Sequence, residues 1–417
     1  MHITKIKVCD AIMGSGKTQA AITYMNEHPE KRFIYITPFL DEVSRIKHAC
    51  QDLRFQEPER IDEFKRSKVV HTATLIDEGV NIATTHAAFL GYDDEMIENI
   101  KKHEYTLIID EDMEIVDVQA LTKGDYEYLI RHGLIEEHDG LITRTDKHSD
   151  AKAYDDILKF VNNRKVYVKE YGDEGEKAFL FYWTIPEALL TNFVEVYILT
   201  YLFEGQKLHH YLKLCGLPYE NIGVCSCEEY TGYCFTNGAG EIPEYVKNIK
   251  DLIHIYEGPM NDIGEDYYAL SASWLKRNQG KQVMLQLRNN MTNWFRNLNP
   301  ESSASDRLWS TLKDMKEDLK GGGYTKGFLH YNTKASNNYR DRTVLSYSLN
   351  IFPHYTEQKF FQSMGVPLDR DVYATSTMVQ WIWRAAIRDG RAISLYIPSR
   401  RMRELLYDWI ESLGEGV

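Results

Sequence analysis

The chain of 417 residues contains no apolar run of about eighteen residues, so the sequence predicts no membrane-spanning helix. Its six cysteines are too few for a disulfide framework in a chain of this size, which favours a reducing cytoplasm. Residues 1–5 run directly into the first expected strand, so we expect no signal peptide. The net charge of −13 argues against a protein that coats nucleic acid through bulk positive charge, but not against a groove lined locally with Lys and Arg.

No internal repeat or low-complexity segment is visible in the sequence. The hydrophobic content is 43 % and the charged content 27 %, an ordinary mixture for a globular protein. A chain of this length predicts two or three domains.

The most informative pattern is a glycine-rich turn, Ala11-Ile12-Met13-Gly14-Ser15-Gly16-Lys17-Thr18. It follows an expected strand at 6–9 and precedes an expected helix at 19–25. In that context the glycines let backbone N–H groups approach phosphates, and the helix N-terminus adds partial positive charge. Lys17 is expected to reach the β- and γ-phosphates of a nucleoside triphosphate, and Thr18 to bind Mg²⁺. The predicted nucleotide-binding residues are Gly14, Ser15, Gly16, Lys17 and Thr18.

A second pattern lies further along the chain, where the apolar run 105–109 ends in Asp110-Glu111-Asp112. Carboxylates at the end of a buried strand are costly unless they hold a cation or face water. In enzymes with such a phosphate loop the first acid holds Mg²⁺ and the next polarises the attacking water. We therefore expect Asp110 to bind the metal and Glu111 to activate the water.

Alternating strands and helices predict an α/β protein with parallel sheets, whose ligands sit at the carboxyl ends of the strands. The first half has expected strands at 6–9, 32–38, 80–86, 105–109 and 194–200 and a helix at 41–50. The second half has expected helices at 203–214, 309–319, 378–387 and 401–413 and strands at 326–331 and 392–397.

An insertion of about 113–193 is expected to elaborate the first domain. Residues 146–161 are predicted to be helical, and 164–168 and 178–183 to form a hairpin. The predicted domains are 1–204 and 205–417.

Four cysteines cluster between residues 215 and 234 and could bind a structural zinc ion. They lack two paired C-x-x-C knuckles, so buried free thiols are the preferred interpretation. The four are Cys215, Cys225, Cys227 and Cys234.

Taken in order along the chain, several clusters resemble the motifs of superfamily 2 helicases of the DEAD/DEAH-like type. The first half carries Gly14-Ser15-Gly16-Lys17-Thr18 for motif I, Ile36-Thr37-Pro38 followed by Arg45 for motif Ia, Thr84-Thr85-His86 for a TTH-type element, Asp110-Glu111-Asp112-Met113 for motif II, and Leu199-Thr200-Tyr201 at the place of motif III. In motif III only Thr200 matches the family pattern.

In the second half, residues 332–337 resemble motif V, and the segment from Gln380 to Arg388 resembles motif VI. This chain lacks both glycines of motif VI and spaces Arg384 and Arg388 one residue wider than the family does. Because positions four apart share a face of a helix, both arginines are expected to point at one target. Trp381 and Trp383 are expected in the core.

The resemblance implies two RecA-like P-loop NTPase domains, with ATP and Mg²⁺ between them and single-stranded DNA or RNA across their tops. It implies catalytic roles for Lys17, Asp110, Glu111, Gln380, Arg384 and Arg388, and nucleic-acid contacts from Thr37, Arg45, Thr85, His86 and Asn337. The compact plan is similar to helicases of phages and mobile elements, acting in the host cytoplasm in replication or recombination, with further replication proteins as partners. The alternatives are a P-loop ATPase motor or switch without unwinding activity, a degenerate binding module, or an RNA-directed helicase.

Overall fold

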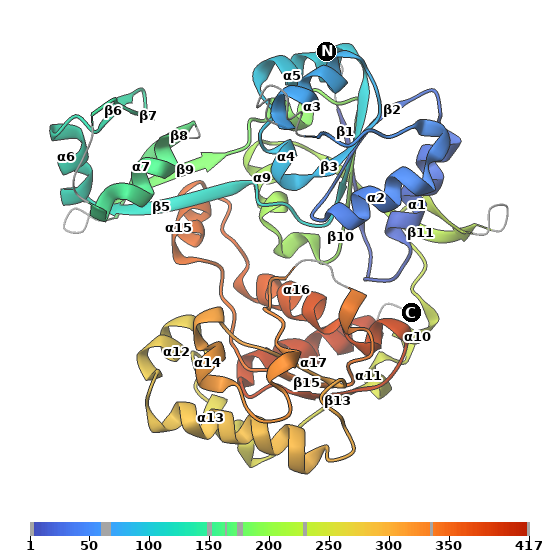
Figure 1. The fold of residues 1–417 in the computed structure, drawn as a ribbon, viewed down its shortest axis with the longest axis vertical. Helices are drawn as coiled ribbons and strands as arrows, with labels where there is room; N and C mark the ends of the chain where they lie inside the picture. The colour runs from blue at the N-terminus through green and yellow to red at the C-terminus, as the bar shows by residue number, and fades with distance from the viewer. Residues whose placement is uncertain are drawn as a thin grey trace.

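The computed structural model describes residues 4–59, 68–147, 152–162, 165–172, 178–227, 232–333 and 337–414. Its described part comprises a seven-stranded sheet, a four-stranded sheet and a five-stranded sheet. We call the residues around the first sheet lobe 1, those from 244 to 414 around the second sheet lobe 2, and the third sheet with its helices, within 116–184, the arm. The arm projects from the side of lobe 1, and lobe 2 lies beneath lobe 1 in the view of Figure 1.

The sheet of lobe 1 has the strand order β12-β11-β1-β10-β4-β2-β3. Its strands are β1 (Lys5–Asp10), β2 (Arg32–Thr37), β3 (Ile82–Thr85), β4 (Tyr105–Asp110), β10 (Glu195–Thr200), β11 (Tyr219–Cys227) and β12 (Gly232–Asn237). Neighbouring strands run parallel except β11 and β12, which form an antiparallel hairpin. The parallel register brings the carboxyl ends of β1, β10 and β4 to one edge, which therefore gathers the polar residues that follow these strands.

Helices cover both faces of this sheet because its central strands are buried on both sides. One apolar layer includes α1 (Lys17–Glu27) and α2 (Leu40–Ala49). The other includes α3 (Lys68–Asp77), α5 (Asp94–Lys102), α8 (Ala188–Thr191) and α9 (Lys207–Leu214). Alternate residues of β4 serve the two layers, since Leu107 and Ile109 face one and Ile108 the other. The short helix α4 (His86–Phe89) follows β3 directly.

The arm is an antiparallel sheet of order β5-β9-β8-β7-β6. Its strands are β5 (Val116–Thr122), β6 (Ile135–His138), β7 (Leu141–Arg144), β8 (Val166–Tyr171) and β9 (Ala178–Thr184), with helices α6 (Lys123–Arg131) and α7 (Asp155–Asn162). The two helices pack on one face of the sheet. The other face contacts α15 (Tyr355–Ser363), a helix of lobe 2.

Lobe 2 has a parallel sheet of order β13-β16-β15-β14. Its strands are β13 (Ile253–Ile255), β14 (Arg307–Ser310), β15 (Val344–Tyr347) and β16 (Ile393–Tyr396). One face carries α10 (Glu244–Lys247), α11 (Ile249–Leu252), α16 (Arg370–Ile382) and α17 (Arg400–Gly414), and the other α12 (Ala272–Asn278), α13 (Gln282–Asn293) and α14 (Lys316–Leu319).

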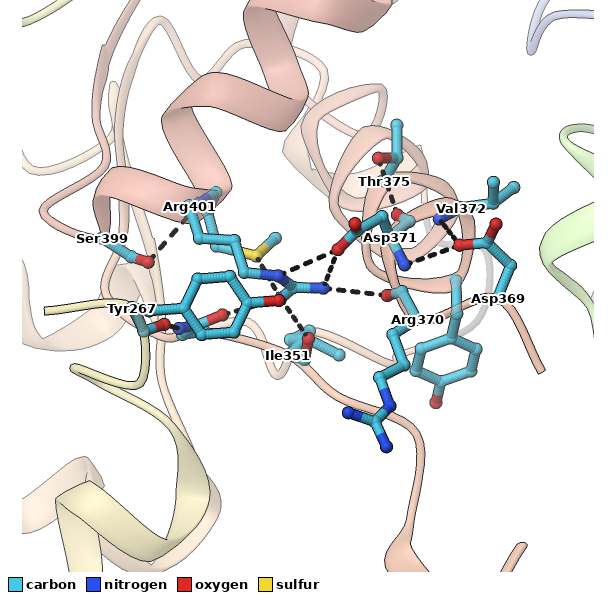
Figure 2. A network of polar contacts seen from close by, with 12 residues as sticks. Tyr267, Ile351, Asp369, Arg370, Asp371, Val372, Thr375, Ser399 and Arg401 are labelled. Atoms are coloured by element: carbon cyan, nitrogen blue, oxygen red, sulfur yellow. Dashed lines mark hydrogen bonds and ion pairs between the residues drawn. The ribbon is translucent and has the colours of Figure 1, made fainter. Parts of the chain in front are cut away.

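A buried arginine fixes the helical layer of lobe 2 (Figure 2). Arg401, at the start of α17, is 3 % exposed and donates to Asp371 Oδ1 at 2.7 Å and 3.0 Å, to the Asn350 side chain and to the carbonyls of Ile351 and Arg370. Its guanidinium also lies over the ring of Phe352. One side chain thus joins the start of α17, the start of α16 and the segment after β15.

The predicted class, two RecA-like α/β domains with parallel sheets and an insertion in the first, is confirmed. The strands expected in the first half and at 392–397, the hairpin of the insertion and the closing helix are all present. The first sheet also includes β11 and β12, which follow the domain boundary predicted at residue 204. In the insertion, the expected helix at 146–161 is represented by α7 after a 3-10 turn, Lys152–Tyr154.

The predictions for 309–319 and 326–331 of lobe 2 are wrong. Residues 309–319 are not one helix, because β14 is a fully buried strand at 307–310 and the helical part is reduced to α14. Residues 326–331 are not a strand, because Thr325–Gly327 forms a 3-10 turn and Phe328 makes an isolated bridge to Trp309. A Cβ on Gly327 would lie 2.2 Å from the carbonyl oxygen of Arg307, so the glycine permits this close approach.

The cysteine cluster also differs from its preferred interpretation. Cys227 and Cys234 form a disulfide across the β11–β12 hairpin, while Cys215 and Cys225 are free. Among the described residues no group of His, Cys, Asp or Glu has the arrangement of a metal site. Within the same part of the chain, no helix combines the length and apolarity needed to cross a membrane.

Candidate active site

The phosphate loop lies between β1 and α1, as the sequence predicts. Gly14 and Gly16 have φ values of +85° and +93°, in the left-handed region that favours glycine. A Cβ on Gly16 would also lie 2.3 Å from the ring of Tyr233 on β12. The Tyr245 hydroxyl donates to the carbonyl of Met13 at 3.0 Å. Two tyrosines that are distant in the sequence, Tyr233 and Tyr245, thus contact the phosphate loop.

The metal-ligand pair expected from the sequence is close together. Thr18 Oγ1 lies 3.3 Å from Asp110 Oδ2, although the two residues come from α1 and β4. Lys17 Nζ donates to the carbonyls of Ala11 and Ile12. Burial lowers the pKa of Lys17, while the charges of Cys9 and Asp110 raise it. Hydroxyl and carboxylate oxygens are ligands that Mg²⁺ prefers, so Thr18 and Asp110 fit such an ion.

Two partners of Asp110 were not predicted from the sequence. The buried hydroxyl of Tyr35, on β2, donates to Asp110 Oδ2 at 2.5 Å. His86 Nε2 lies 3.0 Å from the carbonyl oxygen of Asp110. Burial and the charge of Glu111 raise the pKa of Asp110 to about 7, and the bond from Tyr35 opposes that rise. Tyr35 therefore orients the carboxylate of Asp110, and His86 contacts its backbone.

Glu111 turns out of the sheet at the end of β4. Its φ of +66° is unusual for a residue with a side chain, and its N–H donates to the carbonyl of Leu199 at 3.0 Å. This conformation sends the chain out of β4 while the backbone stays bonded to β10. As a result the carboxylate lines two neighbouring cavities between the lobes.

The first of these cavities is lined by both lobes. Lobe 1 supplies the phosphate loop and acids, and lobe 2 supplies a glutamine and two arginines. The lining residues that bear on the predicted site are Gly14, Gly16, Lys17, Thr18, Arg45, Asp110, Glu111, Thr200, Gln380, Arg384 and Arg388. Residues more than 360 positions apart, Lys17 and Arg384, therefore face one space.

The arginines reach this cavity in a way that the sequence did not predict. The prediction that Arg384 and Arg388 share a face of one helix is wrong, because α16 ends at Ile382 and Arg384 lies in the following turn. Arg388 belongs to the 3-10 turn Ala386–Asp389. The core positions expected for Trp381 and Trp383 are confirmed, and the burial of these two rings fixes the turn.

Arg384 has the environment of a group prepared for an anion. Burial lowers the pKa of its guanidinium, and the charge of Glu111 raises it. Its Nε is buried and has no hydrogen-bond partner among the described residues. Gln380, one turn earlier on α16, donates to Ser376 Oγ at 3.1 Å. A buried donor that faces a cavity without a partner is costly unless a ligand satisfies it.

The second cavity lies beyond Glu111 and Arg384. Both residues line it, together with Gln206 and Lys207 of lobe 1 and Tyr373 of lobe 2. Asn332 and Thr333, from the segment that resembles motif V, line it as well. Residues 334–336 of that motif lie outside the described residues, as does the side chain of Asn337, which begins the 3-10 turn Asn337–Tyr339.

Of the residues expected to contact nucleic acid, Thr37 and Thr85 lie opposite each other at the ends of β2 and β3, and His86 follows Thr85. Thr37 is 1 % exposed and His86 6 % exposed. Thr85 caps α4 through a bond from the N–H of Ala88. Arg45 lines the first cavity and pairs with Glu42 at 2.9 Å. Of these residues His86 contacts the backbone of Asp110. The contact of the set with nucleic acid stays a prediction.

Solved structures with similar folds include helicases at low similarity. The structure of S. tokodaii Xpd4 aligns with a TM-score of 0.44 and 13 % identity over 97 % of this chain and 94 % of that chain. The structure of the DUF1998 helicase MrfA bound to DNA aligns with a TM-score of 0.38 and 11 % identity over 98 % of this chain and 46 % of that chain.

Sequence comparison gives a closer relationship. Residues 247–410 match the YonV C-terminal Rossmann-like domain. The SPbeta prophage-derived uncharacterized protein YonV of Bacillus subtilis (strain 168) is 37 % identical over 417 residues, which cover 98 % of this chain and 99 % of that protein. This identity over nearly the full length of both proteins shows that the chain belongs to the YonV family.

Proposed function

We propose that this protein hydrolyses ATP between its two lobes and uses the energy to move along or unwind nucleic acid. The observation that carries the proposal is the first cavity, where Lys17 and Glu111 of lobe 1 face Arg384 of lobe 2. A γ-phosphoryl group in its loose transition state needs positive charge from outside the phosphate loop. When that charge comes from a second lobe, hydrolysis is coupled to movement of the lobes.

Each residue then has a defined task in the reaction. Lys17 and the backbone of the phosphate loop hold the β- and γ-phosphates. Glu111 accepts the proton of the attacking water, and Arg384 and Arg388 offset the charge that develops on the γ-phosphoryl oxygens. Thr18 and Asp110 would hold Mg²⁺, which neutralises phosphate charge when bound.

DNA is the proposed track, in phage or mobile-element replication or recombination. The prophage origin of the relative supports this setting. The same cavity is compatible with an RNA-directed helicase and with a P-loop motor or switch that does not unwind, because the residues lining it act on phosphate and not on the track.

The test is the rate of ATP hydrolysis without nucleic acid, with single-stranded DNA and with single-stranded RNA. We expect stimulation by single-stranded DNA, with Mg²⁺ required throughout. Stimulation by RNA alone would identify an RNA-directed enzyme. Hydrolysis that neither polymer changes would favour the motor or switch, and absence of hydrolysis in every condition would refute the proposal.

A further inference from the structure

Helix α15 belongs to lobe 2 by sequence but packs on the arm of lobe 1. Figure 1 shows it beside β5, separated from the sheet of lobe 2. Phe360 and Phe361 pack with apolar residues of β5 and β9, and Thr356 Oγ1 donates to the carbonyl of Val118 at 3.1 Å. Lys169 on β8 also donates to the carbonyl of Ser363 at 2.8 Å. The arm therefore holds a segment of the opposite lobe.

The inner side of α15 forms an ion pair with Lys207, a residue that lines the second cavity. Glu357 Oε1 lies 2.7 Å from Lys207 Nζ, and Lys207 Nζ lies 2.7 Å from Glu114 Oε2. The side chain of Lys207 is 9 % exposed and that of Glu357 14 %. Glu114 and Lys207 line the second cavity together with Glu111. This ion cluster, in which Lys207 and Glu357 are buried and the side chain of Glu114 is 64 % exposed, connects α15 to the residues beside the proposed catalytic base.

The outer side of α15 is aromatic and basic. Tyr355 is 65 % exposed. The ammonium of Lys359 lies 4.9 Å from the ring centre of Tyr171 on β8 and 5.4 Å from that of Tyr355. The contact with Tyr171 raises the pKa of Lys359, and the nearby charge of Arg370 lowers it. Two cations and two aromatic rings therefore share this surface.

Arg370 is the second cation of the surface. Its carbonyl accepts a bond from Arg401, which fixes the backbone at the start of α16. Its guanidinium points away from that network in Figure 2 and has no hydrogen bond or ion pair with another described residue. The cation is therefore presented from a rigid support and is available to a ligand.

We propose that Tyr171, Tyr355, Lys359 and Arg370 form a contact surface for single-stranded nucleic acid, and that α15 passes its occupancy to the ATP site through Glu357 and Lys207. We call these four residues the α15 surface. Exposed rings beside cations are what a single strand requires, since bases stack on the rings while phosphates pair with the cations. The net charge of the chain is −13, so this cationic aromatic cluster stands out from the rest of the protein. Such a cluster fits a polyanion, such as a nucleic acid, better than it fits the acidic surface of a second copy of this chain. The inference rests on the proposed function.

Binding of fluorescent single-stranded dT20 and U20, measured by anisotropy with a non-hydrolysable ATP analogue, tests the surface. Tyr355→Ala should weaken binding about tenfold, the effect of losing one stacked base. Lys359→Ala with Arg370→Ala should lower the slope of log affinity against log salt by about 1.4, since each phosphate contact on a single strand contributes about 0.7. Lys316→Ala is the matched control, because Lys316 Nζ lies 5.0 Å from the ring centre of Phe328 on another face of lobe 2.

The outcomes separate this inference from the proposed function. If the native protein hydrolyses ATP and binds an oligonucleotide, and the surface variants bind as the native protein does, the inference alone is refuted. If the native protein hydrolyses ATP but binds neither oligonucleotide, the nucleic-acid assignment and the surface both fail. Preference for dT20 or U20 identifies the type of strand that the surface accepts, and either preference supports it.

Glu357→Gln tests the connection to the ATP site. We expect it to bind the oligonucleotide within about twofold of the native protein but to lose most of the stimulation of hydrolysis by nucleic acid. A purely structural role would lower the melting temperature and leave the ratio of stimulated to unstimulated hydrolysis unchanged, which would refute the connection.

Discussion

Two pairs of arginines near the end of the chain have opposite surroundings. Arg401 and Arg403 are 3 % and 6 % exposed, and their guanidinium groups are bonded to carbonyls and carboxylates of lobe 2. Arg384 faces a cavity between the lobes with its Nε unpartnered among the described residues, and Arg388 lines the same cavity. An arginine near a proposed phosphate site therefore indicates a ligand contact only when the partners of its guanidinium group are known. Arginines saturated by protein partners stabilise the fold, whereas Arg384 keeps a buried donor available to a ligand.

The largest effect on hydrolysis is expected at Glu111, the proposed catalytic base in the cavity between the lobes. Glu111→Gln should keep ATP bound but slow hydrolysis by about 10³-fold, because the group that accepts the proton of the attacking water is lost. Single-turnover hydrolysis with an independent measurement of ATP affinity checks it. Glu104→Gln, just before the opposite end of β4, is the control and should leave both quantities unchanged. Full activity in Glu111→Gln would remove the assignment of the site.

Substitution of the fully bonded Arg401 should affect the stability of the fold and not the hydrolysis of ATP. Arg401→Ala should lower the free energy of unfolding by about 2–4 kcal/mol, because it leaves the buried Asn350 side chain and Ile351 carbonyl without their donor. Its neighbour Arg400 is 47 % exposed and pairs at 3.6 Å with Glu265 and Glu404, so Arg400→Ala should cost less than about 1 kcal/mol. Urea unfolding measures both. Equal effects of the two substitutions would contradict the distinction.

A smaller effect is expected from an ion cluster at the other end of lobe 1. Burial raises the pKa of Glu195, but hydrogen bonds from Lys7, Lys31 and Tyr24 outweigh burial and bring the pKa to about 2. Because this value is below that of the unfolded chain, the cluster stabilises the fold above about pH 4.5 and the contribution is lost as the pH falls toward 2.

Glu195→Gln should therefore lower the free energy of unfolding by about 2–3 kcal/mol at pH 7, and the difference from the native protein should narrow at pH 3. Unfolding in urea at the two pH values checks this. The exposed Glu220→Gln on β11 is the control. A difference that stays the same at both pH values would show that the charge of Glu195 is not the cause.

The residues that lobe 1 contributes to the site are predicted from the sequence because the patterns that identify them are local. A strand, a glycine-rich turn and a helix are contiguous, and the acids of β4 directly follow an apolar run. The partners of Asp110 could not be predicted, since Tyr35 lies on β2 and His86 begins α4 after β3, and only the sheet order brings them to the end of β4.

The half-site of lobe 2 depends on packing that no local pattern contains. Helical spacing predicts Arg384 and Arg388 on one helix, but α16 ends at Ile382, before Arg384. The same spacing gave no means of separating these arginines from Arg401, whose partners are distant in the chain. The packing of α15 on the arm could not be predicted either, because an apolar helix face indicates burial but does not identify the surface that buries it.

The central claim is that residues of both lobes act on one γ-phosphate. The most direct test is hydrolysis and ATP affinity in Arg384→Ala and Arg388→Ala with nucleic acid present. We predict that each substitution slows hydrolysis by about 10²–10³-fold while ATP affinity changes only a few fold, because the contact forms mainly in the closed transition state. If both variants hydrolyse ATP at the native rate, the two-lobe mechanism is wrong and the second lobe serves another purpose.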